Sequence, residues 1–440
     1  MRVRFKSWRA IYARGDSGGA IIADEPLVRN YLTESGLASR LPKGIRIWDE
    51  TLRDGEQTPG VAYTPEEKLE IARLMDEIGV PIIDAGLPVV SKEETRAVRA
   101  IANAGLDATV MAAARTVRRD VEACIDCGVD EIALFTAGSD VHIKHKLNLT
   151  REQVKEISVR EVEYAVAHGV AVSFVTEDTV RADLDFIVDL YNACADAGAH
   201  RAVICDTVGV MTPPGILWFF EQITPRLKPI ELSFHGHNDF GLAVANSLAA
   251  CEAGALVPHV CVNGLGERSG NASLEELVVA LEALYGYDTG IDISRIHQLS
   301  QLVERLSGIP IGMHQPLVGH NAFAHESGIH AHGVIKHTAT YEPIQPERIG
   351  RQRTFVFGKH TGSLAVADKL RAGGVEATQE QIAELVQLIK TFAESRSKEG
   401  QQAFIAMVRE RAVRHRGVTE AEFWAMARKA GIHVPEDIGS

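Results

Sequence analysis

Two histidines separated by one residue stand at the end of a short apolar run. They are His235 and His237 in the segment ELSFHGHNDFGLA, residues 231–243. Because side chains of an extended strand alternate between its faces, both imidazoles point to the same side. On an isolated strand such a pair is more often structural. With a nearby carboxylate, however, two neutral imidazoles suit a borderline divalent cation and leave positions open for a substrate.

The elements that must position these histidines alternate regularly between about residues 45 and 300. Eight β-rich runs, from IRIWDE at 45–50 to HVCVNGLGE at 259–267, are separated by amphipathic helical patterns. In the first of these patterns Thr64 and Glu67 form a capping box. Eight βα units over about 250 residues are what a closed parallel barrel requires. The predicted fold class is α/β, a (β/α)8 TIM barrel followed by a smaller helical C-terminal region.

A doubly wound sheet would alternate in the same way, but it usually has fewer strands and a glycine fingerprint after the first. No such fingerprint follows IRIWDE, and GLGERSG at 264–270 has the wrong glycine spacing for a dinucleotide site. The barrel, expected at 45–300, is therefore favoured. Beyond it we expect a linker subdomain at 301–363 that contributes a catalytic histidine, and a helical subdomain at 364–440. Residues 1–44 are expected to be a poorly ordered extension.

The composition argues against several classes of protein. The chain has 440 residues and a formal net charge of -13, which argues against a nucleic-acid partner. No apolar run approaches the roughly 20 residues of a membrane span, so no membrane partner is expected. Six cysteines in so long a chain do not indicate a disulfide framework. A cytoplasmic protein is the prediction.

In TIM barrels the active site lies at the carboxyl ends of the strands. This rule selects the polar residues that stand at or just beyond the predicted strand ends. They are Arg53, Asp54, Arg115, Glu177, Asp206, Thr207, His235, His237, Asn263, Glu267 and Asn271. At the mouth of a barrel, with an acid after the first strand, the histidine pair favours a metal site over a structural role.

Five ordered motifs then become recognisable. DETLRDGEQTPG, HGHNDFGLAVANS, NGLGERSGNASLEE, HESGIH and FGKHTG together resemble the homocitrate synthase/isopropylmalate synthase family, from about residue 45 to about residue 365. The helical tail is similar to that of the nitrogen-fixation type of homocitrate synthase. The resemblance implies a divalent metal ion (Mg, Mn or Zn), acetyl-CoA as co-substrate and a 2-oxo acid acceptor. It also implies a homodimer in which each C-terminal region reaches over the partner's barrel.

The resemblance also implies roles for individual residues, position by position. The implied metal ligands are Asp54, His235 and His237, with Asn271 nearby or weakly bound. Arg53 matches the arginine that faces the reacting carbonyl, and Thr207 matches the residue that holds the 1-carboxylate of the substrate. Glu177 and His330 resemble the acid/base residues. Tyr341 resembles a helper contributed by the C-terminal region.

These residue types suit a Claisen-type condensation of acetyl-CoA with a 2-oxo acid, followed by hydrolysis of the thioester. The product would be a 2-hydroxy-2-carboxymethyl acid. A divalent ion would act as a Lewis acid on the keto group, and Arg53 would add a fixed positive charge there. A base opposite the ketone must take a methyl proton from the thioester, and His330 with Glu177 suits this task.

The acceptor is the least determined part of the reaction. A dicarboxylic or phosphonic acid needs a cation or several donors in the distal pocket, whereas a branched-chain keto acid needs an apolar pocket. Arg115 and the run HIKHK, which begins with His142, predict a cationic pocket. We therefore expect 2-oxoglutarate, giving homocitrate. Isopropylmalate, citramalate, Re-type citrate and 2-phosphonomethylmalate synthesis stay open, and a carbon–carbon lyase or aldolase of the same barrel superfamily is a further alternative.

Overall fold

The computed structural model describes residues 30–396, 398–414 and 417–435. Most of the extension predicted at 1–44 lies outside these residues. Its described end contains a short helix, α1 (Tyr31–Glu34), and a 3-10 helix, η2 (Leu37–Arg40). The Asn30 side-chain amide donates a hydrogen bond to the Leu284 carbonyl at 2.6 Å, which attaches this segment to the helices around the barrel.

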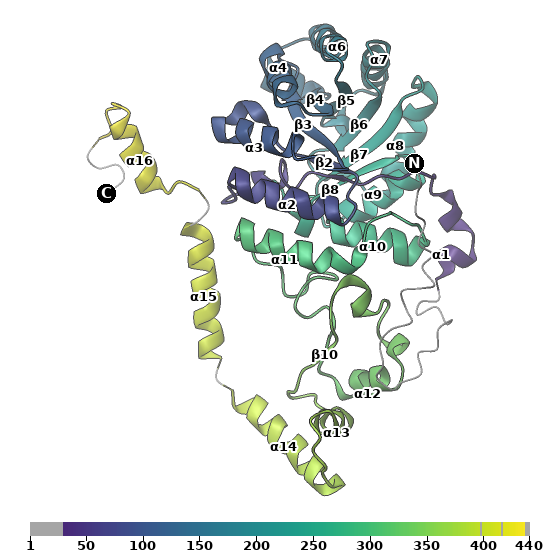
Figure 1. Ribbon diagram of the computed structural model, residues 1–440, viewed down its shortest axis with the longest axis vertical. Helices are drawn as coiled ribbons and strands as arrows, with labels where there is room; N and C mark the ends of the chain where they lie inside the picture. The colour runs from purple at the N-terminus through teal and green to yellow at the C-terminus, as the bar shows by residue number, and fades with distance from the viewer. Residues whose placement is uncertain (1–29, 397, 415–416, 436–440) are drawn as a thin grey trace.

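Eight parallel strands close into a barrel in the order of the sequence, so the predicted fold class is confirmed (Figure 1). The strands are β1 (Trp48–Asp49), β2 (Ile82–Asp84), β3 (Thr109–Arg115), β4 (Glu131–Ala137), β5 (Ala171–Glu177), β6 (Arg201–Asp206), β7 (Glu231–Gly236) and β8 (Val257–Val260). The barrel closes where β8 pairs with β1, with Trp48 opposite His259 and Asp49 opposite Val260. This closure brings the first and last strands of the barrel side by side.

Helices cover the outside of the barrel and bury an apolar layer against it. The principal ones are α2 (Pro65–Glu77), α3 (Lys92–Ala102), α4 (Arg118–Cys127), α6 (Arg151–Ala167), α7 (Leu184–Asp196), α8 (Pro213–Ile223), α9 (Ala243–Glu252), α10 (Leu274–Tyr285) and α11 (Ile296–Ser307). Helix α2 begins with the predicted capping box between Thr64 and Glu67. The inside of the barrel is filled by a separate apolar cluster that includes Trp48, Met111 and Val203, so the barrel is packed rather than hollow.

A buried ion-pair cluster closes the amino-terminal end of the strands. Arg201 at the start of β6 donates a hydrogen bond to Glu131 at 2.7 Å and another to Glu231 at 2.6 Å. The Ser173 hydroxyl also donates to Glu131. These groups lie at the end of the barrel opposite to the carboxyl ends of the strands, where the sequence predicts the active site.

The C-terminal region consists of helices that lead away from the barrel (Figure 1). It contains α12 (Gly328–Lys336), α13 (Ser363–Ala372), α14 (Gln379–Ser395), α15 (Glu399–Arg414) and α16 (Glu420–Lys429), together with two short paired strands, β9 (Ala324–His325) and β10 (Thr354–Phe355). The predicted helical region is thus confirmed. Among the described residues, no helix is long and apolar enough to cross a membrane.

Lys68, a fully buried residue of α2, connects the loop that follows β1 to helix α3. Its ammonium group donates hydrogen bonds to the Leu52 carbonyl at 2.8 Å and to both Glu94 oxygens at 2.7 Å, and it pairs with Glu56 at 2.6 Å. A buried charge is stable only when it is paired and hydrogen-bonded in this way. Lys68 therefore fixes the chain on both sides of Arg53.

We predict that Lys68→Met lowers the free energy of unfolding by about 3 kcal/mol, because Glu56 and Glu94 would lose their shared buried partner. The matched control is Lys155→Met, which removes an exposed pair with Asp189 and should cost less than about 1 kcal/mol. Chemical denaturation followed by circular dichroism measures both. Equal losses of unfolding free energy in the two variants would show that Lys68 contributes no more to stability than an exposed ion pair does.

Candidate active site

A polar cavity opens at the carboxyl ends of the barrel strands. The residues that line it include Glu50, Arg53, Asp54, Leu87, Ala113, Ala133, Phe135, Val175, Glu177, Thr207, His235, His237, His259, Glu267 and Arg268. Most of the residues selected by the strand-end rule therefore share one cavity. The two sets of polar groups that matter most for chemistry come from opposite ends of the barrel sequence, the loop after β1 and the end of β7.

The paired histidines converge on the carboxylate that follows β1. The Nε2 atoms of His235 and His237 lie 3.1 Å apart, and a carboxylate oxygen of Asp54 lies within 4.8 Å of both rings' ligand atoms. All three side chains are buried, with 4% to 7% of each residue exposed. The residues therefore offer two nitrogens and one oxygen, which is a donor set for a borderline divalent cation.

The protonation of the two rings supports this interpretation. His235 Nδ1 lies 2.5 Å from a Glu50 oxygen, so Nδ1 carries a proton and Nε2 faces His237. Burial and then the neighbouring His235 lower the pKa of His237 to about 4, which keeps that ring neutral. Burial lowers the pKa of His235. The charge and the hydrogen bond of Glu50 act in the opposite direction, and the resulting pKa is above the usual histidine value. A proton can therefore bridge the two Nε2 atoms, and a divalent cation would displace it.

Asn271 completes the wall of this cluster. Its amide nitrogen donates to Asp54 at 2.5 Å and to the Leu265 carbonyl at 3.0 Å. Its Oδ1 is buried without a hydrogen-bond partner, as is Nδ1 of His237. Gly266, with a φ of +146°, lets the Asn271 amide lie close to the main chain, because a Cβ at this position would lie 2.2 Å from the amide nitrogen. The free amide oxygen of Asn271 is thus the atom that could face an ion.

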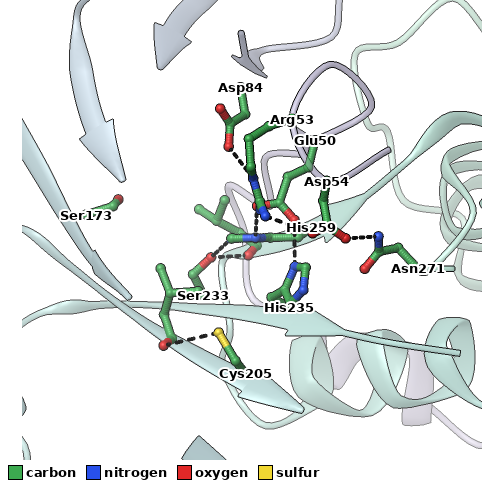
Figure 2. Close-up of polar contacts among 12 residues, drawn as sticks. Glu50, Arg53, Asp54, Asp84, Ser173, Cys205, Ser233, His235, His259 and Asn271 are labelled. Carbon is green, nitrogen blue, oxygen red and sulfur yellow. Dashed lines mark hydrogen bonds and ion pairs between the residues drawn. The ribbon is translucent and has the colours of Figure 1, made fainter. Parts of the chain in front are cut away.

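Arg53 is held by three carboxylates, as Figure 2 shows. Its guanidinium donates to Asp54 at 2.9 Å, to Asp84 at 3.1 Å and to Glu50. Burial raises the pKa of Asp84 to about 7, in spite of the opposing effect of Arg53. Burial would also raise the pKa of Glu50, but Arg53, His235 and His259 together lower it well below its usual range. Arg53 is therefore rigidly oriented at the floor of the cavity.

Sequence reasoning missed three members of this cluster: Glu50, Asp84 and His259. Each is at or near the carboxyl end of a strand, since Glu50 follows β1, Asp84 ends β2 and His259 lies in β8. The strand-end rule that selected Arg53 would have selected Glu50 and Asp84 as well. For His259, the available signal was a histidine within an otherwise apolar strand.

Two more predicted residues lie in the cavity wall. Glu177 ends β5, and both of its oxygens accept hydrogen bonds from Lys146, at 2.7 and 2.8 Å. Lys146 belongs to a one-turn π-helix, η5 (Ile143–Leu147). The Thr207 hydroxyl oxygen accepts a hydrogen bond from the Asp178 backbone at 2.8 Å. Because that bond uses only the oxygen, the hydroxyl hydrogen stays available for a ligand.

The structure does not bring the other predicted residues into this cavity. Arg115 turns away to pair with Asp120, and its side chain is 56% exposed. His142 faces Asp178, with its Nε2 3.8 Å from the carboxylate. Neither Arg115 nor His142 is part of the cavity lining, and in the case of Arg115 the reason is its pairing with Asp120.

His330 and Tyr341 lie together in the C-terminal region. Their rings stack with centroids 4.2 Å apart, and both residues are exposed. Neither lines the cavity of its own chain. Their predicted catalytic roles therefore stay predictions that depend on how chains assemble.

Fold and site together define a TIM-barrel enzyme with its polar cavity at the carboxyl ends of the strands. Residues 44–303 match the family model described as HMGL-like, and residues 317–397 match the one described as homocitrate synthase post-HMGL domain-like. The chain is similar to hydroxymethylglutaryl-CoA lyase from Pseudomonas aeruginosa, with a TM-score of 0.57 over 62% of this chain and 96% of that one. At 23% identity this likeness shows the fold alone.

Curated relatives are much closer in sequence. A protein named "Probable 2-isopropylmalate synthase" from Methanopyrus kandleri is 51% identical over 80% of this chain and 71% of that protein. Homocitrate synthase AksA from the same organism is 47% identical, over 83% and 92%. (R)-citramalate synthase CimA from Methanocaldococcus jannaschii is 44% identical, over 83% and 74%. The chain therefore belongs to the homocitrate synthase/isopropylmalate synthase family, and it is an enzyme, an acyltransferase of that family.

We predict that His237→Ala weakens divalent-ion binding by more than about 100-fold, a larger loss than an outer-sphere partner causes. Isothermal titration of chelator-treated protein with Mn²⁺ or Zn²⁺ measures the affinity. His142→Ala is the matched control, since His142 lies outside the cavity lining, and it should bind the ion as the unmodified protein does. An unchanged affinity in His237→Ala would remove this residue from the proposed ligand set.

Proposed function

We propose that the protein condenses acetyl-CoA with a 2-oxo acid and hydrolyses the thioester, giving a 2-hydroxy-2-carboxymethyl acid. The observation that carries the proposal is the buried cluster in which Arg53 lies beside Asp54, while a ring nitrogen of His235 and one of His237 lie within 4.8 Å of the same carboxylate. The relatives named above support it, because their names refer to homocitrate, 2-isopropylmalate and citramalate.

The side chains of the cavity have distinct tasks in this reaction. Asp54, His235 and His237 would hold a divalent ion, which when bound supplies a Lewis acid for the keto group. The Arg53 guanidinium stabilises the negative charge that develops on the keto oxygen. The Thr207 hydroxyl donates to the 1-carboxylate of the acceptor. These groups bind and polarise the acceptor from one side only.

A base for the acetyl methyl group must come from the other side. Glu177 is in the cavity, but Lys146 engages both of its oxygens. His330 and Tyr341 are exposed on the C-terminal region, so they would reach a substrate only against the surface of another chain. That region also exposes large apolar side chains, among them Leu388, Phe392, Phe404, Met407, Phe423 and Met426. We therefore propose a homodimer in which the C-terminal region of one chain covers the barrel of its partner and supplies His330 as the base.

The wall of the cavity favours an acceptor with a small or branched apolar group. Leu87, Ala113, Ala133, Phe135 and Val175 form that wall, and none of them offers a charge or donor to a second carboxylate. Burying an unpaired carboxylate against such a wall would be costly. Pyruvate and 3-methyl-2-oxobutanoate therefore suit the cavity best, which differs from the 2-oxoglutarate expected from the sequence.

2-Oxoglutarate is a second candidate because of Lys146, a cation beside this wall; Arg268, which lines the cavity, pairs with Asp239. Lys146 contacts Glu177 at the edge of the cavity, so it could pair with a distal carboxylate if it left Glu177. The 47% identity to a homocitrate synthase supports this candidate as well. Oxaloacetate and a phosphonopyruvate-like acid would need the same cation.

We predict that the specificity constant for pyruvate or 3-methyl-2-oxobutanoate exceeds that for 2-oxoglutarate by more than about tenfold, or about 1.4 kcal/mol of transition-state stabilisation. Release of coenzyme A can be followed with a thiol reagent. All six cysteines are free and buried, so the native enzyme should add little background. The panel should also contain oxaloacetate and phosphonopyruvate. A preference for 2-oxoglutarate that disappears in Lys146→Met would establish the second candidate instead.

We also predict complementation between two inactive chains, His330→Ala and Asp54→Ala. If each site combines the barrel of one chain with His330 of the other, a mixed dimer contains one intact site. Random mixing should then restore about a quarter of the unmodified activity in a symmetric dimer. Each variant alone serves as the control. Verified mixed dimers without activity would place each site within a single chain.

A further inference from the structure

Glu50 occupies the position between the two halves of the candidate site. It follows β1 directly, and only 2% of the residue is exposed. One carboxylate oxygen accepts a hydrogen bond from the Arg53 guanidinium, and the other accepts one from His235 Nδ1 at 2.5 Å. Figure 2 shows Glu50 beside both side chains. Among the described contacts, no hydrogen bond joins Arg53 directly to either histidine, so Glu50 is the hydrogen-bonded link between them.

His259 packs beside Glu50 in the barrel interior. Its Nδ1 lies 3.1 Å from the Glu50 oxygen that Arg53 also contacts, but it makes no hydrogen bond. Its Nε2 lies 2.7 Å from the Ser233 hydroxyl oxygen. Because Ser233 donates its own hydrogen to the Val257 carbonyl, it must accept from His259. The ring also packs on Trp48, with centroids 3.9 Å apart, so His259 cannot swing aside without disturbing the packed interior.

We propose that Glu50 is a positioning residue that fixes the orientations of Arg53 and His235 relative to each other. By accepting from Nδ1, it directs Nε2 of His235 toward His237 and Asp54, as outer-sphere carboxylates do for metal-bound histidines. By accepting from the guanidinium, it holds the positive charge of Arg53 against the same site. The inference rests on the proposed function, which gives Arg53 and His235 their tasks at one keto oxygen.

The geometry distinguishes this role from direct ligation. Glu50, His235 and His259 also lie close enough together to form a candidate ligand group. An ion there would need the Nδ1 lone pair of His235, whereas Nδ1 is 2.5 Å from a carboxylate oxygen and hydrogen-bonded to it. Glu50 therefore supports the site of Asp54 and the two histidines rather than forming a second one.

The test is the divalent-ion affinity of Glu50→Gln. An amide has one acceptor oxygen and one NH₂ group, so it can satisfy His235 or Arg53 but faces the other with a donor. We expect titration of chelator-treated protein with Mn²⁺ or Zn²⁺ to show about 10- to 100-fold weaker binding. The visible absorption of bound Co²⁺ should change as well, because the orientation of His235 changes. Glu50→Asp, which keeps two acceptor oxygens, should recover part of the affinity.

The matched control is Glu131→Gln at the opposite end of the barrel. Glu131 is also buried and also accepts from an arginine, Arg201, but it does not line the cavity. It should lower the unfolding midpoint without changing ion affinity. Unchanged affinity in Glu50→Gln, or equal losses in both glutamine variants, would overturn the positioning role. A loss as complete as that in His237→Ala would make Glu50 a ligand and overturn it too.

The same titrations separate this inference from the proposed function. Ion affinity is measured without acetyl-CoA or a 2-oxo acid, so it does not depend on turnover. If the unmodified protein binds the ion but converts none of the 2-oxo acids, the proposed function fails while the effect of Glu50→Gln still supports the positioning role. If Glu50→Gln fails to fold, Glu50→Asp carries the test, with an affinity equal to that of the unmodified protein as the overturning result.

Discussion

The closure of β8 onto β1 is the constraint on which the candidate site depends. Arg53 and Asp54 follow the first strand, whereas His235 and His237 come from the seventh, and nothing local in the chain brings them together. The register Trp48–His259 and Asp49–Val260 sets the first strand beside the eighth, and β7 pairs with β8 in turn. A parallel barrel gathers all carboxyl ends at one rim, so residues almost 200 positions apart share one cavity.

The charge of the cluster gives that cavity its chemistry. Three carboxylates, Glu50, Asp54 and Asp84, surround the single guanidinium of Arg53, which leaves an excess of two negative charges in a buried place. Uncompensated buried charge is costly, and a protein relieves it by binding protons or a cation. The upward pKa shifts of Asp84 and His235 show the first response. A divalent cation at Asp54 would provide the second and would also supply the Lewis acid that the proposed condensation needs.

Those parts of the site that depend on strand order and strand ends could be predicted from the sequence. The spacing of His235 and His237 placed both rings on one face, and the barrel rule placed Arg53 and Asp54 at the same rim. Directions of long side chains could not be predicted in this way. Arg115 turns toward Asp120, five residues later, and His142 toward Asp178 in the next βα unit. A partner on another element is invisible to a rule about strand ends.

Arg115 shows how the direction of a single side chain can affect the choice of acceptor. In the register of the sheet it lies opposite Phe135, which lies opposite Val175, and both of those side chains line the cavity. The main chain therefore places Arg115 in the correct layer for a cationic wall. Its guanidinium leaves that layer only because Asp120 in the first turn of α4 accepts both of its hydrogen bonds. Arg115 is 56% exposed, but the Asp120 carboxylate that it pairs with is buried. Strand register thus decides which residues can reach the acceptor, whereas a pairing with a buried carboxylate on the following helix decides whether a charge is among them.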